Sequence, residues 1–196
     1  MTRIFDVVIA SIALAVSSPI ILVAVVAVRI ESHGSAIYRQ HRVGKDGEPF
    51  EMLKIRTMVS GAEFQGAGLA LNYGDPRITR VGKVLRRFSI DELPNLVNVL
   101  RGEMSIVGPR PTIQVQVDQY TDRQRRRLEV KPGLTGWAQV NGRASLPWHE
   151  RIELDLWYVE HRSFLLDLRI IWRTIEMLVT GSGLYKGEKG GWKPNA

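Results

Sequence analysis

Two adjacent carboxylates, Asp91 and Glu92, lie in the segment Ser89-Ile90-Asp91-Glu92, whose order is that of a helix capping box. The segment predicts a helix with both acids in its first turn. There the macrodipole favours an ionised carboxylate, so we expect Asp91 to be an anion at neutral pH and available as a nucleophile or a metal ligand. Neighbouring helical residues point about 100° apart, so the two acids should have different roles. Ordinary capping is the alternative role for both.

Arginines on both sides of these acids favour a chemical role over simple capping. Arg86 and Arg87 come just before the acids, and the rigid turn Gly108-Pro109-Arg110-Pro111 fixes another arginine after them. Guanidinium groups bind phosphate through paired hydrogen bonds. A carboxylate beside a bound diphosphate needs a cation to offset the repulsion, and we expect that cation to be Mg²⁺. The histidines are scattered, and no Walker loop or Rossmann fingerprint occurs.

The elements that must position these side chains follow from periodicity. Apolar residues from Ile78 to Phe88 recur at helical spacing with basic residues between them, which predicts an amphipathic helix with a basic face. Two extended runs, Ala36 to Gln40 and Phe50 to Met58, flank Asp46-Gly47 and predict a small β-hairpin. The segment from Ser60 to Pro76 is rich in Gly and Asn, and we expect a loop there.

Three further helices are predicted in the second half of the chain. Gln114 to Glu129 is polar and ends in the basic run Arg123 to Arg127, which we interpret as a solvated face or a surface that contacts lipid headgroups. Pro147 to Tyr158 carries an apolar stripe. Phe164 to Val179 is strongly apolar with charges along one seam, which fits an interfacial membrane helix and a core helix with one wet edge equally well.

The N-terminal segment is apolar almost without interruption. A helix from Ile4 to Val28 would reach about 37 Å at about 1.5 Å per residue, more than the about 30 Å of a hydrocarbon core. The run is too long for a signal-peptide h-region, and Asp6 interrupts it. Ser17-Ser18-Pro19 predicts a kink, because proline cannot donate to the carbonyl four residues earlier. Basic flanks at both ends favour a helix that dips and returns; a kinked spanning helix is the alternative.

The composition narrows the partners. The chain has 196 residues and a formal net charge of +7, which points to nucleic acid, a phospholipid surface or a phosphorylated small molecule. We expect no nucleic-acid partner, because an apolar segment is present and basic residues are not interleaved with aromatic ones. The chain has no cysteine, which excludes a thiolate metal site and a cysteine nucleophile. Catalysis must therefore use oxygen or nitrogen groups.

Six motifs stand in order between Arg3 and about Thr180. They are Ser18-Pro19, Phe50 to Met58, Leu85 to Pro94, Gly102 to Pro111, Pro132 to Arg143 and Glu153 to Val159. Together they resemble the small monotopic phosphoglycosyl transferases, the bacterial sugar transferase family that starts glycoconjugate assembly on polyprenyl phosphate. Several long motifs in one order are far more specific than any single motif.

The resemblance implies a two-step reaction. Asp91 would attack the sugar-bearing phosphate of a UDP-sugar, release UMP and hold the phospho-sugar covalently, and polyprenyl phosphate would then displace it. Mg²⁺ would sit near Asp91, while Glu92 would support metal binding or proton handling. Arg86 and Arg110 match positions that contact phosphate or donor.

Three more residues fall in family motifs near the site: Lys54, Arg143 and Tyr158. The resemblance implies that they contribute to substrate binding. It also implies that the N-terminal helix is re-entrant, with its bend at Ser18 and Pro19.

The predicted fold is α+β and mostly helical. We expect a re-entrant membrane helix over residues 1–30, a catalytic domain over 31–180 with amphipathic interfacial helices and the β-hairpin, and a flexible tail over 181–196. The expected location is the cytoplasmic face of the bacterial inner membrane. Expected partners are a UDP-sugar donor, polyprenyl (undecaprenyl) phosphate and anionic membrane lipids, and a homodimer is compatible with the sequence. A membrane-tethered adaptor that kept the fold without catalysis is the alternative function.

Overall fold

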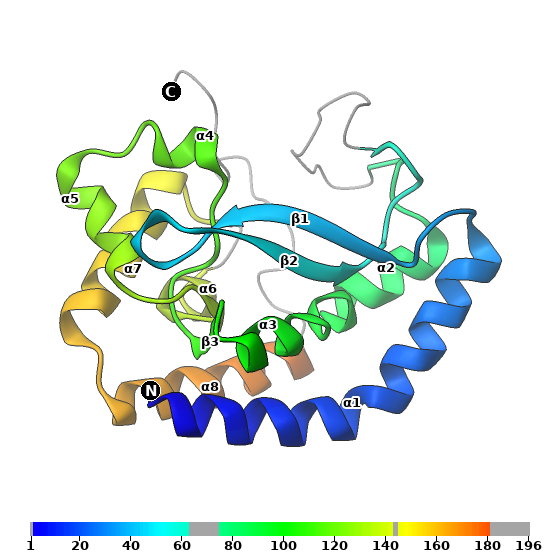
Figure 1. Cartoon of the computed structure of the whole chain (residues 1–196), viewed down its shortest axis with the longest axis horizontal. Helices are drawn as coiled ribbons and strands as arrows, with labels where there is room; N and C mark the ends of the chain where they lie inside the picture. Colours follow the sequence, from blue (N-terminus) through cyan, green and yellow to red (C-terminus); the bar gives the residue numbers. More distant parts are fainter. Residues whose placement is uncertain (1, 63–74, 143–144, 181–196) are drawn as a thin grey trace.

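The computed structural model describes residues 2–62, 75–142 and 145–180, and helices dominate it (Figure 1). In chain order the elements are α1 (Arg3–Glu31), β1 (Ile37–Val43), η1 (Lys45–Gly47), β2 (Pro49–Ile55), α2 (Arg80–Arg87), η3 (Ile90–Glu92), α3 (Asn95–Arg101), β3 (Ser105–Val107), α4 (Gln114–Val117), α5 (Asp122–Arg125), η4 (Arg126–Glu129), β4 (Gly133–Thr135), α6 (Trp137–Val140), α7 (Trp148–His161) and α8 (Phe164–Thr180). The mostly helical α+β prediction is confirmed. The tail after Thr180 lies outside the described residues, as does most of the expected loop between Ser60 and Pro76.

The predicted hairpin is confirmed. Strands β1 and β2 pair antiparallel, with Ile37 opposite Ile55 and Val43 opposite Pro49. In the connecting turn Asp46 and Gly47 both adopt positive φ angles, 56° and 87°, which is the conformation that Asp and Gly tolerate best. Strand β2 ends earlier than predicted. Its inward side chains, including the buried Met52 and Ile55, join the core above α3 and α1.

A second, parallel pair of short strands fixes the turn that contains Arg110. Ser105 of β3 lies opposite Gly133 of β4, and the two backbones approach so closely that a Cβ on Gly133 would lie 2.1 Å from the nitrogen of Gly108. Only glycine fits there. The close approach continues past the strands, where the nitrogen of Gly133 donates to the carbonyl of Pro109 at 2.8 Å. The proline-rich turn therefore leaves β3 in a fixed direction.

Helix α2 confirms the helix predicted over Ile78 to Phe88. Thr79 caps it by accepting from the nitrogen of Gly82 at 2.9 Å. The helix lies directly against the segment after β2, since a Cβ on Gly82 would lie 2.1 Å from the carbonyl oxygen of Thr57. This contact carries Arg86 to the same side of the hairpin as Lys54.

The capping box predicted at Ser89 is wrong. Ser89 has a left-handed backbone (φ 54°, ψ 24°), makes no side-chain cap, and donates its backbone nitrogen to the carbonyl of Arg86 at 3.1 Å. It therefore ends α2, and it starts only the short turn that follows, where its carbonyl accepts from the nitrogen of Glu92 at 3.1 Å. Asp91 and Glu92 form the short 3₁₀ turn η3, and α3 begins after Pro94. A proline fits the start of a helix, because its missing N–H has no intrahelical partner there.

The single helix predicted from Gln114 to Glu129 is also wrong. The segment divides into α4, α5 and the 3₁₀ turn η4. A capping box occurs at Thr121, whose side chain accepts from the backbone of Gln124 while the Gln124 side chain accepts from the backbone of Thr121. That cap starts a new helix and so interrupts the one expected from composition. The helices predicted at Pro147 to Tyr158 and Phe164 to Val179 are confirmed as α7 and α8.

Helix α1 is attached to the rest of the chain at both ends. Near its start, Arg3 donates to the carbonyls of Val99 and Leu100, and the buried Asp6 accepts from the Ser105 hydroxyl and the Ile106 nitrogen, each at 2.9 Å. In Figure 1 the helix runs beneath α3, changes direction partway along and rises beside α2.

At the other end of α1, the Glu31 carboxylate accepts from the first two backbone nitrogens of α2, at 2.8 and 3.0 Å. Ala24 and Val28 pack there with Ile55 and Leu85. Pro19 lies inside the helix, and the Ser18 hydroxyl donates to the carbonyl of Ala15 at 2.8 Å.

The outer face of α1 is apolar and exposed. Among the described residues α1 is the helix long and apolar enough to cross a membrane. Helix α8 lies beside it in Figure 1, and the rings of Phe5 and Phe164 meet edge to face at 5.1 Å. Helix α8 buries Asp167 and Ile170 but exposes Leu165 and Trp172, so it has both a core face and an apolar outer face. An exposed apolar face on two neighbouring helices marks an interaction surface.

Candidate active site

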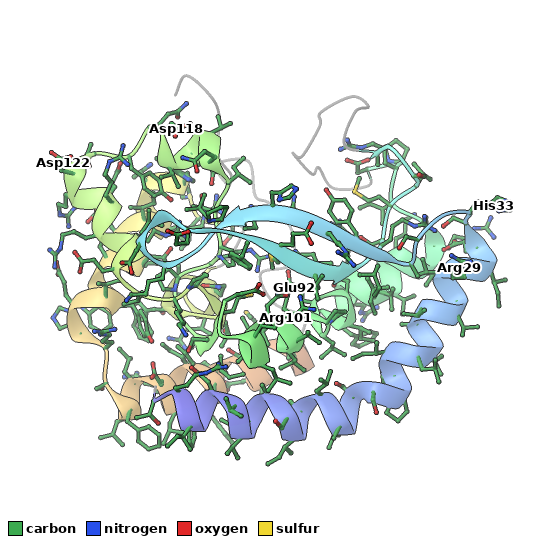
Figure 2. All side chains as sticks on the ribbon, viewed as in Figure 1. Arg29, His33, Glu92, Arg101, Asp118 and Asp122 are labelled. Carbon is green, nitrogen blue, oxygen red and sulfur yellow. The ribbon has the colours of Figure 1, made fainter. Side chains whose placement is uncertain are left out.

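The two predicted acids lie in the interior, beneath the hairpin. Figure 2 shows Glu92 at the centre of the fold, whereas Asp118 and Asp122 lie at its edge. Asp91 is buried and 8% exposed. The turn η3 is held between the ends of α2 and α3 and contacts β2. The fold therefore brings the two carboxylates inside. A buried charge is costly unless an opposite charge or a hydrogen-bond donor lies beside it.

Glu92 has two cationic partners from different elements. Lys54 of β2 donates from Nζ to Oε1 at 3.1 Å, and Arg110 donates from Nη2 to the same oxygen at 2.6 Å. Three of the predicted site residues thus meet, although they are far apart in sequence. Glu92 raises the pKa of Arg110, whereas burial lowers the pKa of Lys54.

Asp91 has a different environment. Within the described part of the chain, its carboxylate has no hydrogen-bond or ion-pair partner. Burial, followed by the charge of Glu92, raises the pKa of Asp91 to about 6, against the opposing effects of Lys54, Arg86 and Arg110. We expected a helix dipole to keep Asp91 ionised by lowering its pKa. This lowering does not occur, because η3 is one short 3₁₀ turn. With a pKa of about 6, Asp91 is still mainly an anion at pH 7 and above.

Arg86 approaches the acids from α2. Its Nε donates to the Thr57 hydroxyl at 2.7 Å, and Thr57 is itself buried. This bond orients the guanidinium, and its charge lowers the pKa of Asp91. Arg86 therefore joins Lys54 and Arg110 around Asp91, as predicted.

Arg42 is a fourth cation at the site, and the sequence reasoning missed it by counting it only as a basic flank of the N-terminal helix. Its Nη2 donates to Gln40 Oε1 at 2.7 Å, and its Nε is buried without a hydrogen-bond partner. Burial, together with the charge of Arg110, lowers the pKa of Arg42 to about 10. The available signal was its position, two residues beyond the expected strand end at Gln40. An arginine there belongs to the hairpin and could have been proposed to face the site.

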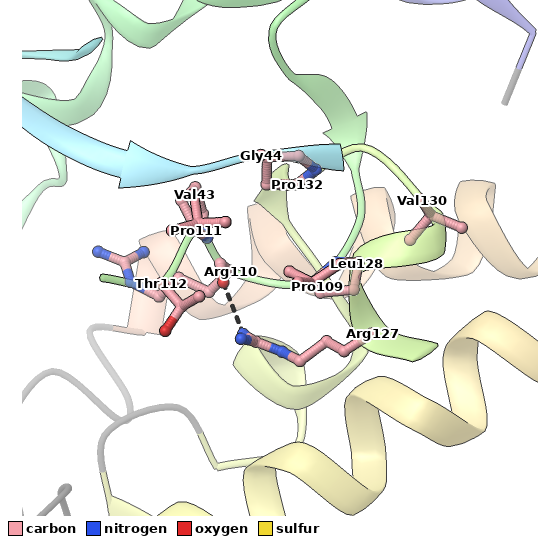
Figure 3. Close-up of a pocket in the computed structure, with 10 residues that line it drawn as sticks. All are labelled: Val43, Gly44, Pro109, Arg110, Pro111, Thr112, Arg127, Leu128, Val130 and Pro132. Atoms are coloured by element: carbon pink, nitrogen blue, oxygen red, sulfur yellow. Dashed lines mark hydrogen bonds between the residues drawn. The ribbon is translucent and has the colours of Figure 1, made fainter. Parts of the chain in front are cut away.

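Arg127 supports the site from behind. It is buried, donates from Nε to Asp155 Oδ2 at 2.6 Å, and donates from Nη2 to the carbonyl oxygen of Arg110 at 2.5 Å (Figure 3). It also donates to the Tyr120 hydroxyl at 2.6 Å. The guanidinium thus ties the turn that carries Arg110 to α7.

Sequence reasoning missed this role, because the run Arg123 to Arg127 suggested a solvated or headgroup-contacting face. Arg123 and Arg126 are exposed, but they pair with Glu153 and Glu160 of α7 at 2.6 and 2.8 Å. The recurrence of acids along α7 was the available signal that this run meets another helix.

Two predicted substrate-binding residues are not brought to the acids by the described contacts. The Tyr158 ring is in the core, and its hydroxyl donates to Asp167 Oδ1 at 2.7 Å. Burial, followed by the bond to Asp167, raises the pKa of Tyr158. Arg143 lies outside the described residues. A substrate-binding role for either residue stays a prediction.

The charges of this site do not balance. Four cations, Lys54, Arg86, Arg110 and Arg42, surround two carboxylates, and Glu92 is already paired. Buried cations without acidic partners are costly unless an anion binds between them. Guanidinium groups favour phosphate in particular. The arrangement therefore suits an anionic phosphate compound bound beside an open carboxylate.

The residues present also fit magnesium. Among the described residues, no three His, Asp or Glu side chains gather closely enough to hold a metal by themselves. Magnesium, however, is commonly held by one or two carboxylates together with substrate phosphates and water. Asp91 provides one such carboxylate, with no partner among the described side chains.

Comparisons with known proteins show the family of this chain. Residues 1–181 match the bacterial sugar transferase family, and the chain belongs to that family. It is accordingly an enzyme, a sugar-phosphate transferase. The chain is 42% identical to an uncharacterized sugar transferase, EpsL, of Bacillus subtilis, over 94% of this chain and 90% of that protein.

Two relatives have more specific names. The UDP-glucose:undecaprenyl-phosphate glucose-1-phosphate transferase of Caulobacter vibrioides is 43% identical, over 93% of this chain and 71% of that protein. The UDP-N-acetylgalactosamine-undecaprenyl-phosphate N-acetylgalactosaminephosphotransferase of Aeromonas hydrophila is 42% identical, over 91% of this chain but only 43% of that protein. Similarity therefore extends over nearly all of the present chain.

Proposed function

We propose that this enzyme transfers a phospho-sugar from a UDP-sugar to undecaprenyl phosphate and releases UMP, with Asp91 as the nucleophile. The observation that carries the proposal is the buried carboxylate of Asp91, unpaired among the described residues, beside three cations, Lys54, Arg86 and Arg110. The names of the relatives supply the donor and acceptor classes. The reaction would be the first membrane step in the synthesis of a bacterial glycoconjugate.

In the first step an Asp91 oxygen attacks the sugar-bearing phosphorus of the donor. A bond forms between that oxygen and phosphorus, the bond from phosphorus to the bridging oxygen breaks, and UMP leaves with the electron pair. In the second step a phosphate oxygen of the acceptor attacks the same phosphorus. This frees the Asp91 carboxylate and leaves a polyprenyl-diphospho-sugar.

The cations give this chemistry its electrostatic support. Lys54 and Arg110 are oriented by Glu92, and Arg86 by Thr57. Fixed charges stabilise a transition state better than solvent does, because they need no reorganisation during the reaction. Arg42 adds a cation that has no acidic partner of its own in the described chain and suits a donor phosphate. Glu92 is then a positioning residue and Asp91 the catalytic one.

We infer that Asp91, together with the donor phosphates, would hold a magnesium ion. When bound, it would neutralise phosphate charge and reduce the repulsion that an incoming carboxylate meets. The open carboxylate of Asp91 supports this assignment.

We also infer that α1 is re-entrant, bends at Ser18 and Pro19, and places the site at the cytoplasmic face of the inner membrane. The support is that both ends of α1 bond to the same globular body, through Arg3 and Asp6 at one end and Glu31 at the other. A straight spanning helix would separate its ends by the bilayer thickness. A lipid phosphate at headgroup depth could then reach Asp91 without leaving the membrane.

Intact-protein mass spectrometry tests the reaction. We expect purified protein incubated with Mg²⁺ and a UDP-sugar, without acceptor, to gain the mass of one phospho-sugar and to release UMP. Asp91→Asn should gain no mass. Asp118→Asn is the matched control, because Asp118 is an exposed acid far from the site, and it should behave as wild type.

Across a panel of UDP-sugars, a folded wild-type protein that neither gains mass nor releases UMP would contradict the proposal. An adduct that persists in Asp91→Asn would contradict the choice of nucleophile. The adaptor alternative predicts that Asp91→Asn changes nothing measurable.

A further inference from the structure

A cavity of about 290 Å³ lies away from Asp91 and Glu92. It is bounded by the start of α1, the strand β3, the segment that joins η4 to β4, and the end of α7. The lining does not include the cations of the candidate active site, which are Lys54, Arg86, Arg110 and Arg42. Its wall includes Ser105 and Val107 of β3 and the buried ring of Tyr158.

The charged residues that line this cavity are mainly basic. They are Arg3, Lys45, Lys131 and Arg162, against Asp6 and Glu129. The Asp6 carboxylate is already occupied, because it accepts from the Ser105 hydroxyl and the Ile106 nitrogen. Glu129 pairs with Arg126 at 3.4 Å. Lys45 pairs with Asp46 at 3.2 Å. The acids that line the cavity therefore leave Arg3, Lys131 and Arg162 without an ion-pair partner among the described residues.

Two of these cations converge on one point. The Arg3 Nη2 and the Lys131 Nζ each lie 3.5 Å from the position that a Cβ on Gly102 would occupy. Neither Lys131 nor Arg162 forms an ion pair with any residue that the structure describes. The Arg3 guanidinium donates to the carbonyls of Val99 and Leu100 at the end of α3, so Lys131 lies beside an arginine that is already fixed in place. The cavity wall thus combines a fixed arginine with two basic side chains, Lys131 and Arg162, that have no acidic partner among the described residues, and this lining suits an anion.

The cavity lies at the edge of the apolar outer face. Arg3 begins α1 and Arg162 precedes α8. Ile4, next to Arg3, and Leu165, three residues after Arg162, are each 77% exposed. The contact between Phe5 and Phe164 joins the two helices at this point. A ligand held here could keep its charge among the basic residues and an apolar tail along α1 and α8.

We propose that this basic cavity binds the phosphate of an anionic phospholipid headgroup and thereby anchors the N-terminal end of α1 at the membrane surface. The chemistry recognised is a phosphate ester, which could also come from a soluble phosphate. The attached apolar face favours the lipid. The proposal depends on the membrane attachment proposed above but not on the transfer reaction, so the two can fail separately.

Native mass spectrometry of the full-length protein in detergent tests this site. We compare retention of phosphatidylglycerol with that of phosphatidylcholine of the same acyl chains. Wild type should retain phosphatidylglycerol preferentially. The double variant Lys131→Glu with Arg162→Glu should weaken that retention roughly tenfold or more. Each basic residue near an anionic lipid surface contributes to the binding free energy. Arg125→Glu, an exposed charge reversal on α5, should retain the lipid as wild type does.

Two competition arms identify the source of the phosphate. Glycerol 1-phosphate or inorganic phosphate should displace the lipid only at far higher concentrations. Displacement by either at concentrations similar to that of the lipid would overturn the lipid assignment. Equal lipid retention by wild type and the double variant would overturn the site itself.

The donor-dependent mass gain serves as the folding control, because neither Lys131 nor Arg162 belongs to the transfer site. The double variant should still form the phospho-sugar adduct. If it does not, Lys131→Gln alone replaces it, and an unchanged lipid retention in that variant would equally contradict the proposal.

Discussion

Asp91 is held in a state that costs stability. Its carboxylate is buried beside Glu92, and its pKa is raised to about 6. A buried acid with a raised pKa is a common feature of catalytic sites, because a nucleophile that bonds to nothing in the resting protein remains available for the substrate. The neighbouring Glu92 has the opposite arrangement, with both oxygens near cations.

Asp91→Asn should stabilise the folded protein at neutral pH. The folded pKa of about 6 exceeds the ordinary value of 3.8, so ionisation of Asp91 disfavours folding above pH 4, and the cost is fully present above pH 6. The gain should approach about 3 kcal/mol at pH 7.5 and disappear below about pH 4. Thermal unfolding without magnesium at both pH values measures it. Equal unfolding temperatures of wild type and Asp91→Asn at pH 7.5 would show that the ionised carboxylate does not destabilise the folded protein.

Glu92→Gln should shift the pH dependence of the first step towards acid. In wild type the rate of adduct formation should fall about tenfold per pH unit below the pKa of Asp91, because Asp91 must be ionised to attack. Removing the Glu92 charge lowers the pKa of Asp91 and hence the midpoint. Single-turnover rates from pH 4.5 to 8 test this. A midpoint that stays fixed or rises would rule out Glu92 as a cause of the raised pKa.

At the scale of elements, a buried ion pair joins α7 to the turn after β3. Arg127 and Asp155 are both almost completely buried, and Arg127 also holds the backbone of Arg110 (Figure 3). The position of the Arg110 guanidinium therefore depends on a helix that contributes nothing directly to the two acids.

Arg127→Met should destabilise the protein by about 3–5 kcal/mol, because it leaves the Asp155 carboxylate buried without its partner. Arg123→Met is the matched control, since its ion pair with Glu153 is exposed and should contribute less than about 1 kcal/mol. Chemical unfolding followed by circular dichroism compares them. Similar losses in both variants would contradict a special role for the buried pair.

At the scale of the whole molecule, the decisive feature is that α1 returns to the body from which it starts. The absence of native cysteine makes this testable with single introduced cysteines. Thr2 and His33 are exposed and lie beyond the two ends of α1.

Thr2→Cys and His33→Cys should report the same side of the membrane. In intact spheroplasts both should resist a membrane-impermeant maleimide, and in inverted vesicles both should react. A re-entrant helix requires this agreement, whereas a spanning helix places one residue on each side. Opposite labelling of the two positions would refute the re-entrant path. Unchanged donor-dependent adduct formation confirms that each variant is folded.

The sequence by itself determined the local structure where one signal dominated. Helical periodicity located α2, α7 and α8, and the Asp46-Gly47 turn located the hairpin. The motif order identified the family, and residue chemistry selected Asp91, Glu92, Arg86 and Arg110. The failures were at boundaries where two local signals compete. Ser89 fits a helix start by type, yet it ends α2 in a left-handed conformation.

Only the tertiary structure decided which charges meet. Arg42 and Arg127 each belong to a basic run, and their spacing along the chain does not reveal that one faces the acids and the other supports Arg110. The tertiary structure also overturned the expectation that a helix dipole governs the ionisation of Asp91. The pKa of Asp91 is governed by burial and by Glu92. Burial and charge proximity are sums over residues distant in sequence. Periodicity reports only local geometry, so the two candidate acids could be selected from the sequence while their electrostatics could not.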